Sequence, residues 1–382
     1  MKQVVILGAT GSIGINTADV MLQHPERFAA HTLVGHRNAD KMAELAEQLR
    51  PQWVVMTDPA AAEQLQGRLP AGCRLETGMQ AAEELVARPE VDIVMAAMVG
   101  SAGLPATLAA VRAGKRVALA NKECLVTAGR IFMREAARHG ARVLPVDSEH
   151  AAVHQALMGH DQKSVRKVIL TASGGPFRDR DPATLKDVTP EQAIAHPNWA
   201  MGAKISVDSA TMMNKALELI EARWLFDMPV EKLSAIIHPQ SIVHALVEYL
   251  DGSVLAQLAM PDMRMPIAYA MQGDSRLTSG IPWLDLAATG SLHFQAVDER
   301  RFPSMRLVRD VLAGRDSLAI AFNAANEVAN QAFRDRRIGF MAIVETVETV
   351  LGKVENVPVD TLEAVWSHDR LARSLATEVI NR

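Results

Sequence analysis

The chain has 382 residues, of which 49% are hydrophobic and 22% charged, and its formal net charge at pH 7 is −4. At roughly 150 residues per domain this length predicts two or three domains, and the apolar fraction suffices for buried cores. The mixed, nearly balanced charge argues against nucleic acid or an anionic membrane as a main partner.

Cysteine usage favours a reducing, cytoplasmic setting. Cys73 and Cys124 lie far apart in the sequence and show neither a disulfide framework nor zinc-ligand spacing. The chain enters an expected strand directly after Met-Lys-Gln, and we identify no targeting segment. The apolar run 91–99 contains Asp92 and is too short to span a bilayer. We therefore expect a cytoplasmic metabolic protein.

The chain opens with an expected strand, a glycine turn and a helix. The apolar run 4–7 leads into Gly8-Ala-Thr-Gly-Ser-Ile-Gly14, and we expect a helix from Ile15. Glycines let the backbone approach a pyrophosphate, and a helix N-terminus supplies amide donors. A plain tight turn would need only one or two glycines. The spacing G-x-x-G-x-x-G thus favours nucleotide binding, although it specifies a class of cofactor and not a reaction.

The end of the second expected strand, 31–34, points to NADP(H). An NAD enzyme usually places an acid there for the ribose 2'-hydroxyl, whereas arginine accommodates a 2'-phosphate. This chain has Gly35-His-Arg-Asn38 and no acid. We expect Arg37 to bind the 2'-phosphate with Asn38 beside it, the alternative being a solvated loop arginine.

Strands and helices continue to alternate through the first half of the chain. Helices are expected at 41–49, 60–65 and 105–113, and strands at 53–56, 92–96 and 116–120. This alternation predicts a parallel, doubly wound sheet whose ligands gather beyond the carboxyl ends of the strands. Two segments there are candidates, the loop 98–103 and Asn121-Lys-Glu123. Lys122 could hold an anion, polarise a substrate oxygen, or pair with Glu123.

Two carboxylates, Asp147 and Glu149, follow the apolar run 143–146. If this segment is extended, positions i and i+2 point to one side and both acids share a small volume. Such a pair needs a cation, a shared proton or water. The alternative is a helix start, with Ser148 as the cap and acids favoured by the helix dipole. Glu218 could add a third carboxylate, and three acids without a Cys or His set favour Mg²⁺ or Mn²⁺ over zinc.

Candidate anion-binding groups appear in the second half. Ser173-Gly174-Gly175 follows an expected strand and is typical of an anion nest, with a type II turn as the alternative. The irregular segment 196–202 suits a lid that excludes water, although its tryptophan could also be core. A helix is expected over 210–225, with Asn214 and Lys215 at helical spacing from Glu218. Taken alone, that spacing also fits a solvated ion pair.

The remaining segments predict an assembly surface and a helical end. The run 241–258 has Asp251-Gly at its centre and predicts a hairpin whose edge could pair with another chain, the alternative being burial against the chain's own helices. We expect Asn323-Ala-Ala-Asn-Glu327 to start or cap a helix and to support the catalytic domain. The fold class expected is α/β, with a Rossmann-like sheet, an α+β catalytic domain and a small helical domain. The expected boundaries are 1–147 for nucleotide binding, 148–279 for catalysis and the hairpin edge that could pair with another chain, 280–304 for a linker, and 305–382 for the helical domain.

Several stretches together resemble the 1-deoxy-D-xylulose 5-phosphate reductoisomerase family. They span nearly the whole chain in order, which makes the combination far more specific than any single glycine motif. The stretches are Gly8-Ala-Thr-Gly-Ser-Ile-Gly14, Leu119-Ala-Asn-Lys-Glu123, Pro145-Val-Asp-Ser-Glu-His150, Thr171-Ala-Ser-Gly-Gly-Pro-Phe177, His196-Pro-Asn-Trp199, 204–218, His238-Pro-Gln-Ser241, Pro261-Asp-Met-Arg264 and Asn323-Ala-Ala-Asn-Glu327.

The resemblance implies a full set of site residues. It places Mg²⁺, Mn²⁺ or Co²⁺ on Asp147, Glu149 and Glu218. It implies substrate phosphate binding by Ser173, Ser209, Asn214 and Lys215, further substrate contacts from Lys122, Ser148 and His196, and lid contacts from Trp199 and Met201. It assigns NADPH to Thr10, Gly11, Ser12, Ile13, Gly35, Arg37, Asn38, Asn121, Glu123 and Gly202. The chain departs from the family at Ala9, where serine is usual, and Arg37 stands where lysine also occurs.

The implied reaction isomerises 1-deoxy-D-xylulose 5-phosphate and reduces the product with NADPH to 2-C-methyl-D-erythritol 4-phosphate, in the methylerythritol phosphate route to isoprenoids. Catalysis is then expected from Lys122, Asp147, Glu149, Glu218 and His196, and a retro-aldol route and an α-ketol shift both remain open. The resemblance also implies a homodimer built partly on the hairpin sheet. One alternative is a semialdehyde-type NADP dehydrogenase, which would need an acyl-accepting cysteine such as Cys124. Another is a noncatalytic nucleotide-binding protein, which would lack part of the metal or phosphate set.

Overall fold

Segments far apart in the sequence form each of the two units of the chain. The computed structural model describes residues 1–196, 199, 201–272 and 275–382. The first unit contains Met1–Cys124, Phe132–Ala151 and Asp262–Pro282, and the second contains Leu125–Ile131, Ala152–Pro261 and Trp283–Arg382.

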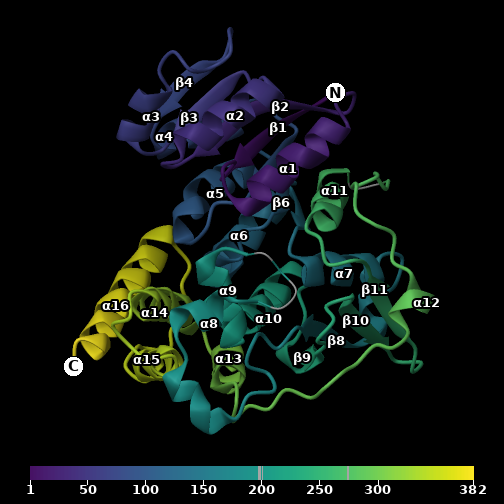
Figure 1. The fold of residues 1–382 in the computed structure, drawn as a ribbon, viewed down its shortest axis with the longest axis vertical. Coiled ribbons are helices and arrows are strands. Elements are labelled where there is room, and N and C mark those ends of the chain that lie inside the picture. Colours follow the sequence, from purple (N-terminus) through teal and green to yellow (C-terminus); the bar gives the residue numbers. More distant parts are fainter. Residues whose placement is uncertain (197–198, 200, 273–274) are drawn as a thin grey trace. The chain divides into compact units, whose positions relative to one another are not determined.

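A seven-stranded parallel sheet forms the centre of the first unit (Figure 1). Its strands are β1 (Lys2–Leu7), β2 (Phe28–Gly35), β3 (Trp53–Met56), β4 (Arg74–Thr77), β5 (Ile93–Ala96), β6 (Arg116–Leu119) and β7 (Arg142–Pro145). The strand order is β4-β3-β2-β1-β5-β6-β7, so the chain changes direction across the sheet at β1 and β5. The predicted doubly wound sheet is confirmed, and ligands of such sheets bind outside this switch point.

Helices connect consecutive strands of this sheet, several of them at positions that the alternation predicts, and the last two helices named here lie outside these connections. They are α1 (Ser12–Gln23), α2 (Ala39–Leu49), α3 (Pro59–Leu65), α4 (Met79–Val86), α5 (Leu104–Arg112), α6 (Glu123–His139), α7 (Ser148–Leu157) and α11 (Arg264–Gln272). The strand β4 and the helices α4, α6 and α11 were not expected from the sequence. The prediction that the first helix begins at Ile15 is wrong, because Gly11 is the N-cap and its carbonyl already accepts from the Ile15 N–H at 2.9 Å.

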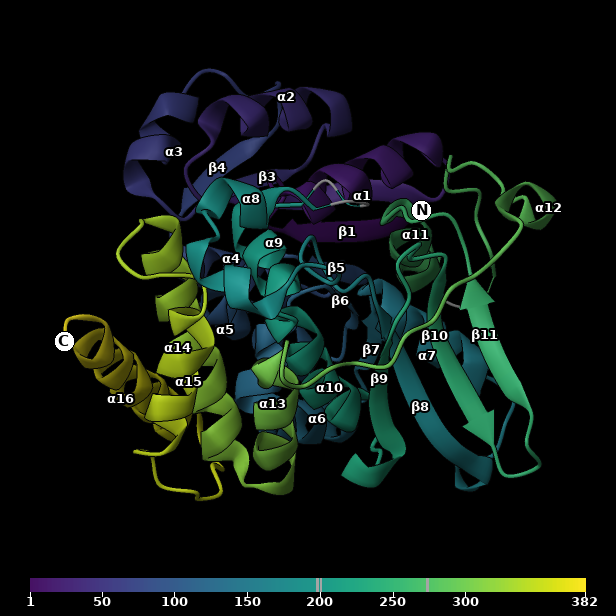
Figure 2. The ribbon, with the colours of Figure 1, turned by 60° about the horizontal axis from the view of Figure 1, so that its bottom comes forward.

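A four-stranded mixed sheet in the order β11-β10-β8-β9 lies in the second unit (Figure 2). Its strands are β8 (Val165–Ala172), β9 (Leu233–Ile237), β10 (Val243–Tyr249) and β11 (Val254–Leu258). The strands β10 and β11 pair in antiparallel register, which confirms the predicted hairpin. The strand β11 is an edge of this sheet, and its first three residues are exposed.

Helices make up the rest of the second unit. They are α8 (Pro190–Ile194), α9 (Ala203–Ala210), α10 (Met213–Leu225), α12 (Leu286–Thr289), α13 (Pro303–Ala313), α14 (Asp316–Arg334), α15 (Ala342–Leu351) and α16 (Leu362–Ile380). Leu217 of α10, Val308 of α13 and Phe322 of α14 belong to one buried apolar cluster. The predicted helical end of the chain is confirmed, and residues 283–302 are mostly irregular apart from α12.

Two local predictions in this unit are wrong. The helix expected over 210–225 is interrupted, because Met212 adopts a left-handed conformation with φ +54° between α9 and α10. The stretch Asn323–Glu327 neither starts nor caps a helix but lies in the middle of α14. In the described part of the chain, no helix combines the length and the apolar character needed to cross a membrane.

Candidate active site

The glycine motif forms a tight turn between β1 and α1. Gly8 has φ +84°, and a Cβ there would lie 2.5 Å from the backbone oxygen of Ala97, which follows β5. A Cβ on Gly14 would lie 2.4 Å from the backbone oxygens of Gly8 and Ala9. Glycine is therefore required at both positions for the backbone segments to approach each other. The turn carries Thr10, Gly11, Ser12 and Ile13 at the start of α1, an arrangement that fits a pyrophosphate.

The end of β2 lies next to this turn. A Cβ on Gly35 would lie 3.5 Å from the Cγ2 atom of Thr10. Asn38 caps α2, since its side chain accepts from the Lys41 N–H at 3.0 Å. The Arg37 side chain is 77% exposed and its Nε lies 3.2 Å from Oδ2 of Asp58. An exposed ion pair of this kind is weak, so the guanidinium can turn to a 2'-phosphate at little cost.

Asn121 links the turns that follow β5 and β6. Its Nδ2 donates to the backbone oxygen of Gly100 at 3.0 Å, and its Oδ1 accepts from the Cys124 N–H at 3.3 Å. The predicted loop 98–103 and the segment 121–123 therefore adjoin each other at the switch point. Glu123, the first residue of α6, is buried.

Lys122 forms an ion pair with Asp147. The Nζ atom lies 2.6 Å from Oδ2, and the two side chains are 8% and 18% exposed. Leu119 of β6 pairs with Pro145 of β7, which brings the carboxyl ends of these strands to the same edge of the sheet. The sequence left open whether Lys122 holds an anion or pairs with a neighbouring acid. In the structure its ion-pair partner is Asp147, two residues after the end of β7.

Asp147 and Glu149 lie close together, although not for the reason that the sequence suggested. The prediction of an extended i, i+2 pair is wrong, because α7 begins at Ser148 and Glu149 belongs to its first turn. The Asp147 backbone oxygen accepts from the Ala151 N–H at 2.8 Å, so a helix starts here as the alternative held, although Ser148 is its first residue and not its cap. Carboxylate oxygens of the two acids nevertheless lie within 4.8 Å of each other.

His150 is a functional candidate that sequence reasoning missed. It is fully buried in the first turn of α7, and one of its ring nitrogens lies within 4.8 Å of a carboxylate oxygen of Asp147. Its position directly after Glu149 was the available signal. Ser148 donates its hydroxyl to Oε2 of Glu149 at 2.6 Å, which orients that carboxylate.

In the second unit, the turn after β8 has the features expected of an anion site. Gly174 and Gly175 have φ +78° and +67°, whereas a type II turn needs only one positive φ. The Ser173 hydroxyl accepts from the Gly175 N–H at 3.1 Å. The structure therefore favours the nest over the simple turn.

His196 contacts this turn in its neutral form. Its Nδ1 accepts from the Trp199 N–H at 3.0 Å, and its Nε2 lies 2.9 Å from the Ser173 hydroxyl oxygen. Burial, with a smaller effect from the charge of Arg178, lowers the pKa of His196 from 6.5 to about 4. We infer that the ring carries its proton on Nε2 and that this N–H donates a hydrogen bond to the Ser173 hydroxyl.

Arg178 is a second residue that sequence reasoning missed. Its Nη1 lies 3.4 Å from the backbone oxygen of Ser173, and its Nε lies 3.1 Å from Oδ2 of Asp179. It therefore places a positive charge beside the turn. The signal was an arginine three residues beyond the double glycine, in a stretch that was interpreted for its glycines alone.

Ser209 lies against the same turn. A Cβ on Gly175 would be 2.8 Å from the backbone oxygen of Ser209 and 2.9 Å from the Cα atom of Ala210. Because only glycine allows this approach, the C-terminal end of α9 and the Ser173 turn pack backbone to backbone. Two of the four residues predicted for the phosphate are thus brought together in one unit.

Asn214, Lys215 and Glu218 lie on α10 and contact one another. Asn214 Nδ2 donates to Oε1 of Glu218, and Lys215 Nζ donates to Oε2. Lys215 is 3% exposed and Glu218 is fully buried. The solvated ion pair considered from the sequence is therefore wrong, because both side chains are buried. A buried carboxylate that accepts from two side-chain donors is typical of a functional position.

The predicted lid is described only in part. Residues 197, 198 and 200 lie outside the described residues, while Trp199 and Met201 are half-buried. Gly202 is the N-cap of α9 with an extended backbone. Closure of this segment over a ligand stays a prediction.

Comparisons with known proteins agree over the whole chain. Three family models match: 1-deoxy-D-xylulose 5-phosphate reductoisomerase at residues 4–129, its C-terminal domain at 143–226, and the DXP reductoisomerase C-terminal domain at 258–375. A 1-deoxy-D-xylulose 5-phosphate reductoisomerase from Ralstonia pickettii is 52% identical to this chain. The alignment covers 100% of this chain and 98% of the Ralstonia protein.

Solved structures give the same result. A DOX-P reductoisomerase in complex with NADPH, fosmidomycin and magnesium has TM-score 0.94 at 40% identity and covers 100% of this chain and 98% of its own. The Zymomonas mobilis 1-deoxy-D-xylulose 5-phosphate reductoisomerase in complex with NADPH has TM-score 0.93 at 42% identity and covers 100% and 99%.

Proposed function

The chain belongs to the 1-deoxy-D-xylulose 5-phosphate reductoisomerase family, and on this premise we propose how its residues perform the reaction. It is an oxidoreductase that uses NADPH and a divalent metal to convert 1-deoxy-D-xylulose 5-phosphate to 2-C-methyl-D-erythritol 4-phosphate, in the methylerythritol phosphate pathway to isoprenoids. The observation that carries this conclusion is similarity at 52% identity along the entire chain.

The substrate phosphate binds to Ser173, Ser209, Asn214 and Lys215 in this proposal. The close approach of Gly175 to Ser209 supports it, because it brings two of the four proposed residues, Ser173 and Ser209, to adjoining segments. Lys215 supplies a buried positive charge. Binding of a phosphate remote from the reacting carbons anchors the substrate and contributes to transition-state stabilisation.

The divalent metal, Mg²⁺, Mn²⁺ or Co²⁺, is held by Asp147, Glu149 and Glu218 in this proposal. Two observations support the fit: oxygens of Asp147 and Glu149 lie within 4.8 Å of each other, and Glu218 is a fully buried carboxylate. Oxygen donors of this kind suit hard cations. When bound, the metal supplies Lewis-acid polarisation of substrate oxygens.

Lys122, Ser148 and His196 contact the substrate, and Trp199 and Met201 cover it. Lys122 is buried beside Asp147, so its ammonium is oriented before substrate arrives. The hydroxyl of Ser148 is oriented by Glu149. His196, neutral near pH 7, adds no charge and contacts the Ser173 hydroxyl through Nε2. Water exclusion by the two lid side chains would strengthen these contacts.

NADPH, the hydride donor, binds to the glycine turn and its neighbours. The residues proposed for it are Thr10, Gly11, Ser12, Ile13, Gly35, Arg37, Asn38, Asn121, Glu123 and Gly202. The close approaches at Gly8 and Gly14 support a phosphate cradle, and the exposed Arg37 suits the 2'-phosphate.

A cytoplasmic homodimer is the expected working form. The edge strand β11 exposes Val254 and Leu255, 49% and 38% respectively, and so offers backbone donors and apolar surface to a second copy. Two free cysteines suit a reducing compartment.

Loss of NADPH absorbance with 1-deoxy-D-xylulose 5-phosphate tests the function directly. We expect oxidation that stops on chelation, returns with Mg²⁺ or Mn²⁺, and yields the branched polyol phosphate. No oxidation by folded protein that binds NADPH would favour the noncatalytic alternative. The semialdehyde alternative predicts turnover that depends on Cys124, whose side chain is buried and poorly placed for acyl transfer.

A further inference from the structure

Asp208 is a buried carboxylate that none of the site assignments uses. It lies in α9, directly before Ser209, and is 1% exposed. A buried acid is costly to keep charged unless donors surround it. Here Oδ1 accepts from Asn326 Nδ2 at 2.9 Å and Asn330 Nδ2 at 2.8 Å, and Oδ2 lies 3.0 Å from Lys204 Nζ.

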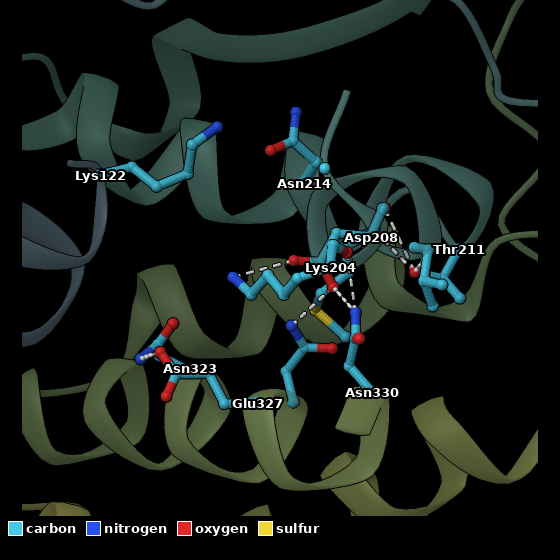
Figure 3. Close-up of polar contacts among 12 residues, drawn as sticks. Lys122, Lys204, Asp208, Thr211, Asn214, Asn323, Glu327 and Asn330 are labelled. Carbon is cyan, nitrogen blue, oxygen red and sulfur yellow. Dashed lines mark hydrogen bonds and ion pairs between the residues drawn. The ribbon is translucent and has the colours of Figure 1, made fainter. Parts of the chain in front are cut away.

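These contacts join α9 to α14. Asn326 and Asn330 are four residues apart, so both project from one face of α14, and Figure 3 shows Asn330 and Lys204 directed at Asp208. Asn330 also donates to the backbone oxygen of Lys204 at 2.9 Å, and its own Oδ1 accepts from Arg334 Nε at 2.9 Å. The helix α9 is therefore fixed at its first turn and at its centre.

The far end of α9 meets the phosphate turn. A Cβ on Gly175 would lie 2.8 Å from the backbone oxygen of Ser209, so a small rotation of α9 would either separate these segments or make them collide. Beyond Ser209, the chain turns sharply at Met212, where the Thr211 hydroxyl accepts from the Met213 N–H at 3.3 Å. The position of α9 therefore also sets where α10 begins with Asn214 and Lys215.

We propose that Asp208, held by Asn326 and Asn330, is a positioning residue for the substrate phosphate. Its charge keeps α9 against α14 at the orientation that presents Ser209 to the Ser173 turn and directs Asn214 and Lys215 toward the same phosphate. This inference rests on the proposed phosphate site. It gives a function to Asn326, which the sequence placed at a helix end with no chemistry.

The test replaces Asp208 by Asn, which keeps the shape and removes the charge. We expect the KM for 1-deoxy-D-xylulose 5-phosphate and the inhibition constant of inorganic phosphate to rise together by about tenfold, because small misplacements of binding groups have effects of this size or larger. The KM for NADPH is expected to stay within about twofold, since the lesion concerns substrate binding and not the cofactor.

Glu327→Gln is the matched control. Glu327 lies on the same helix, where it accepts from Asn323 at 3.1 Å and from Arg373 at 2.6 Å, and Figure 3 shows its contact with Asn323 apart from Asp208. Like Asp208→Asn, the substitution Glu327→Gln replaces a carboxylate by an amide, so it measures the effect of destabilising α14 in general. We expect a lowered Tm with unchanged constants for substrate and inorganic phosphate.

Three outcomes would overturn the proposal: unchanged constants in folded Asp208→Asn, an equal rise in Glu327→Gln, or an equal rise in the KM for NADPH. If Asp208→Asn does not fold, Asn330→Ala decides the same question, because it removes one amide donor and leaves the charge paired with Lys204. Absence of turnover in the unmodified protein would instead reject the proposed function. In that case, the dissociation constant of inorganic phosphate is measured by calorimetric titration. We expect the same ratio of about tenfold between Asp208→Asn and the unmodified protein.

Discussion

At the scale of single residues, His196 combines an unusually low pKa with a defined contact. Burial, with a smaller effect from Arg178, lowers its pKa from 6.5 to about 4, so it is neutral in the folded protein near pH 7. A histidine whose pKa is depressed by folding binds protons more readily when unfolded. Its favourable contribution is thus present above pH 6.5 and is lost as the pH falls from 6.5 toward about 4.

We therefore predict that His196→Asn makes the stability of the folded protein less dependent on pH in the acid range. The Tm of the unmodified protein should fall between pH 6.5 and 4 more steeply than that of the variant, because the variant has no ring to protonate in the unfolded state. Differential scanning calorimetry across this range gives both slopes. Equal slopes would mean that His196 is not neutralised by folding.

Glu218 carries a second prediction at this scale. Glu218→Gln removes one of the three proposed metal carboxylates, and we expect turnover to fall by about a hundredfold or more and metal affinity to weaken. NADPH affinity, measured by fluorescence, should stay nearly constant. Glu248→Gln, on β10 and paired with Arg166 at the surface, is the control. Normal turnover in Glu218→Gln would remove this residue from the mechanism.

Most residues of the proposed site could be named from the sequence, because they occur in stretches that resemble the family, and their roles stay predictions. Asp147 and Glu149 were correctly paired, yet the assumed extended geometry was wrong, since sequence does not fix where a strand gives way to a helix. Arg178 and His150 were missed for a different reason. Their significance depends on what lies beside them, Ser173 for one and Asp147 for the other.

At the scale of elements, the chain is organised by turns that bring helix ends to strand ends. The parallel sheet was predictable, because short apolar runs alternate with helical segments at regular spacing. The division between α9 and α10 was not, since Met212 is an ordinary helix former held at φ +54° by its surroundings. The same holds for α14, whose asparagines resembled a cap in the sequence but are buried against another helix.

The Gly175 contact gives a prediction for elements. Ala at a left-handed position costs about 1–2 kcal/mol from the backbone alone, and at Gly175 the added Cβ would also meet Ser209 and Ala210 at 2.8 Å and 2.9 Å. We expect Gly175→Ala to lower the Tm and raise the KM for the phosphorylated substrate. Chemical denaturation and steady-state kinetics measure the two effects.

Gly159→Ala separates the two causes. Gly159 has φ +78°, and nothing lies within 4 Å of the Cβ that would be added. This variant experiences the backbone strain without the close contact. If Gly159→Ala and Gly175→Ala have equal effects on stability and on KM, then the packing of α9 against the Ser173 turn has no part in substrate binding.

At the scale of the whole molecule, the second sheet has an edge strand with exposed apolar side chains. In the described part of the chain, β11 is an edge strand with Val254 and Leu255 exposed, and Trp283, at the start of the irregular segment in the same unit, is 93% exposed. Apolar edges of this kind invite pairing with another chain. The proposed homodimer, if it pairs at β11, would bury Val254 and Leu255.

Leu255→Glu tests this assembly. Leu255 pairs with Val247 of β10 across the hairpin, so its backbone stays hydrogen-bonded while a charge is placed on the exposed edge. We expect light scattering to show a dimer for the unmodified protein and a shift toward monomer for the variant, because burying an unpaired carboxylate in an interface is strongly unfavourable. Leu371→Glu, on α16 and 48% exposed, introduces the same charge elsewhere and should leave the mass unchanged. A dimer that persists in Leu255→Glu would mean that the copies meet on another surface, and Trp283 would then be the next residue to change.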